Sequence, residues 1–108
     1  MIEIGIKPQD VRSVEDVKEV IKKLFKGKDV RVYIFGSRVK GEHTPRSDLD
    51  IGFLSNEDIS YELSLLKEFL EESNLTFVVD IVDLSRTSKD FREAVMKEGK
   101  LWINLKSS

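Results

Sequence analysis

The stretch "IFGSRVKGEHTPRSDLDIGFL", residues 34–54, contains a Gly-Ser pair, a basic spacer and two aspartates that flank a leucine. The apolar residues of "DLDIGFL" predict a strand, in which successive side chains point to opposite faces. Asp48 and Asp50 therefore share one face, with Cα atoms roughly 7 Å apart. The core-facing side is expected to carry Leu49, Ile51 and Phe53. A strand that only builds a core has no use for carboxylates, which are unfavourable to bury without a partner.

Two carboxylates on one face repel each other unless a cation lies between them. Hard divalent ions with oxygen ligands, Mg²⁺ above all, meet that need, especially where a substrate phosphate completes the coordination shell. The basic residues that are candidates for the same role are Arg31, Arg38 and Arg46. None of them offers an equally good partner at a fixed spacing, so the pattern favours a metal site.

Gly36 and Ser37 directly follow a strand predicted over "DVRVYIF", residues 29–35, and open a short helical turn. Glycine lets a ligand approach the backbone closely, and the N–H groups and the serine hydroxyl can donate to phosphate oxygens. A Gly-Ser pair after a strand is weak evidence alone. Together with D-x-D at the start of the next strand, it favours a phosphate site beside a metal site.

A third carboxylate would complete the metal site, and "FVVDIVDL", residues 77–84, supplies two choices. Asp80 lies within the apolar run, where an unpaired charge is costly. Asp83 lies at the end of the run, where a turn or capping role is ordinary. The sequence favours Asp80 and leaves Asp83 as the alternative.

Outward from this stretch, the patterns predict one domain over residues 1–108 of the α/β class, an α+β mixed sheet with flanking helices. Residues 1–10 form an extra strand or an arm in this prediction. The expected elements are a helix capped by Ser13 and closed by Gly27, a strand over 29–35, a helical turn over 37–41, a strand over 48–54, a helix over 57–72, a third central strand over 75–84, a helix capped by Thr87 or Ser88 and stopped by Gly99, and an edge strand over 100–105.

Composition excludes several classes of protein. The absence of cysteine excludes disulfides and thiolate metal sites, and a single histidine, His43, excludes a His-rich zinc site. The net charge of −2 gives no sign of nucleic-acid binding. No apolar run is long enough to span a membrane, and the N-terminus does not read as a secretory signal. We therefore expect a cytoplasmic protein that binds neither membrane nor nucleic acid.

Gly36-Ser37, ten intervening residues and then Asp48-Leu49-Asp50 resemble the signature of the minimal nucleotidyltransferases, of the DNA polymerase β-like superfamily. Arg38 and Gly41 within the spacer and Ser47 before the first aspartate are also similar to that family. "VDIVDL" resembles the strand that bears the third carboxylate of the family, which corresponds to Asp80. The resemblance implies a polymerase β-like nucleotidyltransferase fold.

The resemblance further implies the transfer of AMP from ATP to a hydroxyl group. Small relatives act as antitoxins that modify a tyrosine of a HEPN-domain toxin, so it implies a HEPN-domain partner. By analogy, Asp48, Asp50 and Asp80 are the catalytic residues and hold two Mg²⁺ ions. The predicted nucleotide-binding residues are Gly36, Ser37, Arg38 and Arg46.

Two other functions remain open at this stage. The chain is small, which suits an antitoxin that neutralises its partner by contact alone. Transfer to a small molecule or an RNA end is the other alternative, although the negative charge and the lack of an extra substrate-binding domain count against it. The acceptor, the base of the triphosphate and a homo-oligomer are left undecided by the sequence.

Overall fold

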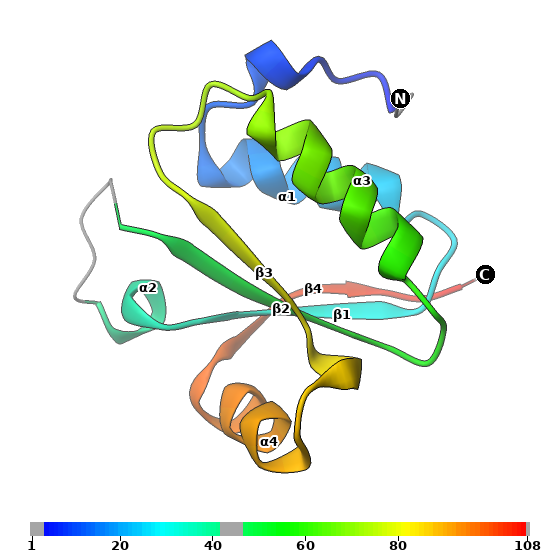
Figure 1. Cartoon of the computed structure of the whole chain (residues 1–108), viewed down its shortest axis with the longest axis vertical. Helices are drawn as coiled ribbons and strands as arrows, with labels where there is room; N and C mark the ends of the chain where they lie inside the picture. The colour runs from blue at the N-terminus through cyan, green and yellow to red at the C-terminus, as the bar shows by residue number, and fades with distance from the viewer. Residues whose placement is uncertain (1–3, 42–46, 108) are drawn as a thin grey trace.

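A computed structural model describes residues 4–41 and 47–107 (Figure 1). Its centre is a mixed four-stranded sheet with the strand order β3-β2-β1-β4. The strands are β1 (Val30–Phe35), β2 (Leu49–Ser55), β3 (Val79–Asp83) and β4 (Lys100–Leu105). β1 pairs antiparallel with both β2 and β4, whereas β2 and β3 run parallel. Because β2 and β3 are parallel, the start of each strand lies at the same end of the sheet.

Helices connect the strands, and their ends follow local sequence signals. They are η1 (Pro8–Asp10), α1 (Val14–Leu24), α2 (Ser37–Lys40), α3 (Ser60–Glu71), η2 (Leu84–Arg86) and α4 (Lys89–Glu98). Ser13 caps α1, as the sequence predicts, and the structure adds a reciprocal capping box with Asp16. Ser88, rather than Thr87, caps α4 by accepting a hydrogen bond from the backbone N–H of Phe91.

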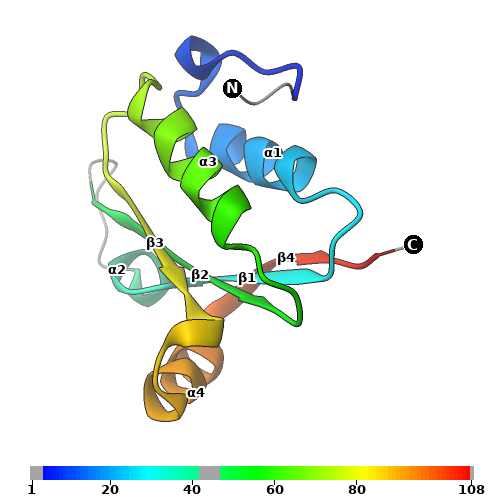
Figure 2. The ribbon, with the colours of Figure 1, turned by 45° about the vertical axis from the view of Figure 1, so that its right-hand side comes forward.

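The two faces of the sheet are covered unequally (Figures 1 and 2). α1 and α3 pack on one face and form the larger core, into which β2 contributes Leu49, Ile51 and Phe53, all fully buried. On the opposite face, η2 and α4 form a smaller core around Tyr33, Leu84 and Val95. The second face is therefore the one with room for a site.

Several expectations need correction. The strand predicted as central over 75–84 is β3, which is shorter and lies at the edge of the sheet. The helix expected from residue 57 begins at Ser60, and α1 ends at Leu24, before Gly27. Residues 4–7 form no strand, although Ile4 and Ile6 pack against the larger core. Residues 1–3 of the predicted strand or arm lie outside the described residues.

Within the described residues, no helix is both long and apolar enough to cross a membrane. This agrees with the absence of a long apolar run in the sequence. The edge position predicted for "KLWINL" is confirmed by β4, which pairs only with β1 in the described sheet.

Candidate active site

Asp50 and Asp80 are neighbours across the parallel β2–β3 pair. The register places Asp50 directly opposite Asp80, and adjacent strands lie about 4.8 Å apart. Partners in a parallel register project to the same face, which here is the face that α4 covers only in part. Asp48, which immediately precedes β2, lies two positions from Asp50 and completes an acidic group at one end of the sheet.

The surroundings of Asp50 disfavour its ionised form. Partial burial raises the pKa of its carboxyl group, and the negative charges of Asp80 and Asp48 raise it further. Asp50 is half-buried, whereas Asp48 and Asp80 are exposed. A bound cation would relieve the repulsion that Asp50 experiences from these two carboxylates.

The turn between β1 and α2 lies against Asp50. Gly36 has a φ of +81°, a conformation that disfavours any side chain, and a Cβ atom there would collide with Oδ2 of Asp50. Any residue other than glycine is therefore disfavoured at position 36, both by the backbone conformation and by the collision with Asp50. Phe35, the preceding residue, pairs with Asp50 in the β1–β2 register. The structure thus places Gly36 against Asp50, and the role of Ser37 remains a prediction.

Arg38 makes contacts that the sequence did not predict. Its guanidinium donates from Nε and Nη2 to the backbone oxygen of Ser47, at 3.2 and 2.8 Å. It also lies over the ring of Phe77, 4.7 Å from the centroid. These contacts tie α2 to the residue before Asp48, so Arg38 holds the two halves of the motif together. Its predicted role toward a nucleotide remains a prediction, and Arg46 and His43 lie outside the described residues.

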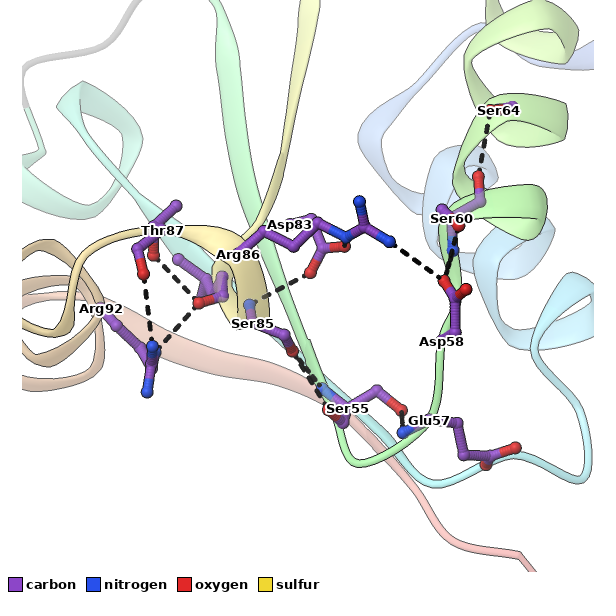
Figure 3. Close-up of polar contacts among 11 residues, drawn as sticks. Ser55, Glu57, Asp58, Ser60, Ser64, Asp83, Ser85, Arg86, Thr87 and Arg92 are labelled. Atoms are coloured by element: carbon purple, nitrogen blue, oxygen red, sulfur yellow. Dashed lines mark hydrogen bonds and ion pairs between the residues drawn. The ribbon is translucent and has the colours of Figure 1, made fainter.

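Asp83, the alternative third carboxylate, has a different environment (Figure 3). It caps η2 by accepting a hydrogen bond from the backbone N–H of Ser85 at 3.1 Å, and it contacts Nε of Arg86 at 3.5 Å. Its β-ladder partner is Phe53, three residues beyond Asp50. Because side chains alternate along a strand, Asp83 and Asp80 project to opposite sides of β3.

The donor set suits Mg²⁺ held jointly with a substrate. Among residues 4–41 and 47–107, no three acidic or histidine side chains are gathered closely enough to hold a metal ion by themselves. Mg²⁺ usually binds through one or two carboxylates, with phosphate oxygens and water in the remaining positions. Adjacent aspartates beside a glycine turn fit that mode of binding, and they do not fit a closed metal cage made of protein ligands alone.

Two features near the site were not predicted from the sequence. The side chain of Leu84 in η2 packs directly against the backbone at Gly52, since a Cβ there would lie 2.8 Å from Cδ1 of Leu84. A glycine inside a strand pattern is a known signal of such an approach. The rings of Phe35 and Phe91 meet edge to face with centroids 6.1 Å apart. No signal in the sequence pairs these two residues, which are far apart along the chain.

Comparison with known proteins agrees with this geometry. Residues 17–107 match the family described as polymerase beta, nucleotidyltransferase. A probable protein adenylyltransferase, MntA, of Haemophilus influenzae is 41% identical over 91 residues, which cover 82% of this chain and 78% of that protein. A putative protein adenylyltransferase of Methanocaldococcus jannaschii is 22% identical over 94 residues, covering 83% and 94% of the two chains.

The fold also has a counterpart among solved structures. A chain from a crystal structure of a toxin–antitoxin with AMP-PNP superposes with a TM-score of 0.60 at 26% identity. The match covers 82% of this chain and 73% of the other. The mixed sheet with flanking helices is therefore the polymerase β-like nucleotidyltransferase fold that the motif implied.

Proposed function

Because this chain belongs to the polymerase beta nucleotidyltransferase family, we propose that it is an antitoxin that transfers AMP from ATP to a tyrosine hydroxyl of a HEPN-domain toxin. The observation that carries the proposal is the Asp50–Asp80 pair in register beside the Gly36 turn. This arrangement places two carboxylates beside a glycine turn at one end of the sheet.

In the proposed reaction, the acceptor oxygen attacks the α-phosphorus of ATP in line with the leaving group. The new bond joins that oxygen to the α-phosphorus, and the bond from the α-phosphorus to the α,β-bridging oxygen breaks and releases pyrophosphate. The backbone at Gly36 and Ser37 holds the β- and γ-phosphates through its N–H groups. Asp80, the exposed member of the strand pair, receives the proton of the attacking hydroxyl.

Asp48, Asp50 and Asp80 would hold two Mg²⁺ ions. When bound, the ions neutralise charge that develops on the pyrophosphate and lower the pKa of the attacking hydroxyl. Asp50 lies between Asp48 along β2 and Asp80 across the sheet, so these carboxylates would hold the ions as one group.

The acceptor class is supported by the relatives. Both curated relatives carry names that describe transfer of an adenylyl group to protein, and the solved structure is a toxin–antitoxin with AMP-PNP. A protein acceptor also suits a chain of 108 residues, because a partner can supply the acceptor side of an open site.

The test is a transfer assay with α-labelled ATP, Mg²⁺ and the protein encoded by the adjacent gene. We expect the label on a tyrosine of that protein, and its loss when Asp48 and Asp50 are both replaced by Asn. Equal labelling by the wild type and the double variant would refute the enzymatic proposal. If the double variant also neutralises the toxin fully, the antitoxin acts by contact, and label on a small molecule or an RNA end would instead identify a different acceptor.

A further inference from the structure

A cavity of about 340 Å³ lies at the end of the sheet opposite to the candidate active site (Figure 1). We call it the distal pocket. It lies where β1 begins and where β2 and β4 end, and its polar lining consists of Asp29, Arg31, Ser55, Asn56, Asn104 and Lys106. Arg31 pairs with Leu54, four positions along the ladder from the pair of Phe35 and Asp50. Roughly 14 Å of strand therefore separates the two sites.

The strand register brings polar side chains together in this pocket. Arg31 lies directly opposite Asn104 in the ladder between β1 and β4, and such partners project to the same face of the sheet. Tyr33 shares that face with Arg31, because it follows two residues later. Tyr33 is buried in the smaller core with Leu84 of η2, whereas Arg31 is exposed. The elements on this face thus cover Tyr33 and leave Arg31 open to a ligand.

The pocket presents hydrogen-bond donors that the protein itself does not use. Arg31, Asn56, Asn104 and Lys106 are all exposed and carry N–H donors. Among residues 4–41 and 47–107, none of these four side chains has a hydrogen-bond or ion-pair partner. We refer to them as the four donor residues. Two of them are cations, so the pocket suits a ligand that is anionic and rich in acceptor oxygens.

The acidic groups around the pocket are already engaged. The carboxylate of Asp29 accepts hydrogen bonds from the backbone N–H and the hydroxyl of Ser107, at 2.7 and 3.2 Å. Glu57 accepts from the backbone N–H of Asp29 at 3.1 Å, and its carboxylate lies 3.7 Å from Nζ of Lys28. These contacts direct both carboxylates away from the donor residues, so the positive charge of the pocket is not neutralised from within.

The backbone around the pocket is held in place by hydrogen bonds. The bonds from Ser107 to Asp29 fix the segment that carries Lys106. The hydroxyl of Ser55 donates to the backbone oxygen of Asp29 at 2.6 Å and accepts from the backbone N–H of Glu57 at 3.1 Å (Figure 3). These bonds also fix the turn that carries Asn56. A backbone that is ordered before binding lowers the entropic cost of holding a ligand.

We propose that the distal pocket binds the phosphate group of a small phosphate monoester. Such a group carries a charge of about −1.5 to −2 near neutral pH, which matches the two cations Arg31 and Lys106. A guanidinium can bind two phosphate oxygens at once, and an ammonium group binds phosphate as a point charge. The asparagine amides can donate to the remaining oxygens. The cavity is larger than a phosphate group alone requires, which leaves room for the organic part of the ligand. This site is independent of the proposed transfer reaction.

The experiment is an amide NMR titration of the isotope-labelled protein, with EDTA and without Mg²⁺. The probes are AMP, inorganic phosphate, adenosine and glutamate. We expect saturable shifts at the four donor residues with AMP and with phosphate, and no such shifts with adenosine. The signals of Gly36 and Ser37 report separately on the candidate active site. Glutamate that binds the pocket as tightly as AMP would overturn the assignment to phosphate.

Substitutions test the contacts. Arg31→Ala and Lys106→Ala are each expected to weaken AMP binding at the distal pocket about 10-fold, since each removes a hydrogen bond to a charged group. Arg31→Lys keeps the charge but loses the planar fork, so its loss is expected to be smaller than that of Arg31→Ala. Lys100→Ala is the matched control, because Lys100 is an exposed lysine of β4 that does not line the pocket.

Two results would overturn the proposal. One is the absence of saturable shifts at the four donor residues in the wild type. The other is equal weakening by Lys100→Ala and Lys106→Ala, which would report a diffuse positive field rather than a binding site. Because the substituted side chains are exposed, the variants are expected to fold, and unchanged signals from the larger core check this. Either result would leave the proposed transfer reaction untouched.

Discussion

The two faces of β2 differ although their residues alternate along one strand. On the α1–α3 face, Leu49, Ile51 and Phe53 are fully buried. On the other face, Asp50 lies opposite Asp80, Gly52 makes room for Leu84, and Leu54 packs beside the small core. One face stabilises the sheet, and the other face keeps carboxylates accessible at its end. Because side chains alternate along a strand, the residues of β2 that stabilise the core lie on one face and the residues available for chemistry lie on the other.

This separation predicts opposite responses to substitution on the two faces. Ile51→Ala removes a fully buried side chain from the larger core. We expect the free energy of unfolding to fall by about 2–5 kcal/mol, measured by urea denaturation. Ile51→Val serves as the control and is expected to lose about 0.5–1.5 kcal/mol. A loss of under about 0.5 kcal/mol for Ile51→Ala would contradict the assignment of this face to stability.

A smaller effect tests the contact between the Gly36 turn and Asp50. Gly36→Ala is expected to be destabilising by about 1–2 kcal/mol for the positive φ alone, and further by the collision with Asp50. Gly27→Ala is the matched control, because Gly27 has a φ of +87° but nothing within 4 Å of an added Cβ. We therefore expect Gly36→Ala to be the less stable variant in thermal denaturation. Equal stability of the two variants would show that the turn does not press on Asp50.

The smallest expected effect concerns the charge of Asp50. Its raised pKa means that ionisation destabilises the folded state, so Asp50→Asn is expected to be more stable than the wild type at neutral pH. The cost of ionisation sets in as the pH rises from the ordinary value of 3.8 through the folded pKa. The advantage of the variant should thus disappear below that range. Denaturation curves at neutral and acidic pH measure the difference, and an advantage that persists in acid would contradict an electrostatic origin.

Local signals predicted the parts of the fold that depend on neighbouring residues. The capping box of Ser13 and Asp16 and the alternation of β2 can each be read within a few residues. The edge position of β3 could not be predicted from local sequence, because strand order is set by pairing between distant segments. An apolar run predicts burial, and Val79 and Ile81 of β3 pack against the larger core although β3 has a single neighbouring strand in the described sheet.

The sequence predicted which residues belong to the candidate site, but it did not predict how they are arranged in space. Spacing grouped Gly36, Ser37, Asp48 and Asp50, whereas the choice between Asp80 and Asp83 needed the β2–β3 register. The contacts of Arg38 with Ser47 and Phe77 also needed the fold, since both partners lie beyond its own helical turn. Register and side-chain packing are long-range properties that a motif does not encode.

The central claim is that Asp50 and Asp80 together bind a divalent cation and the triphosphate. It is tested most directly by calorimetric titration of Asp80→Asn and Asp83→Asn with AMP-PNP, with and without Mg²⁺. The two positions share β3 but project to opposite sides of it. We expect Asp80→Asn to lose Mg²⁺-dependent binding, and Asp83→Asn to retain it with little change in stability, because an asparagine oxygen can still cap η2. Retained binding in Asp80→Asn together with lost binding in Asp83→Asn would contradict the account.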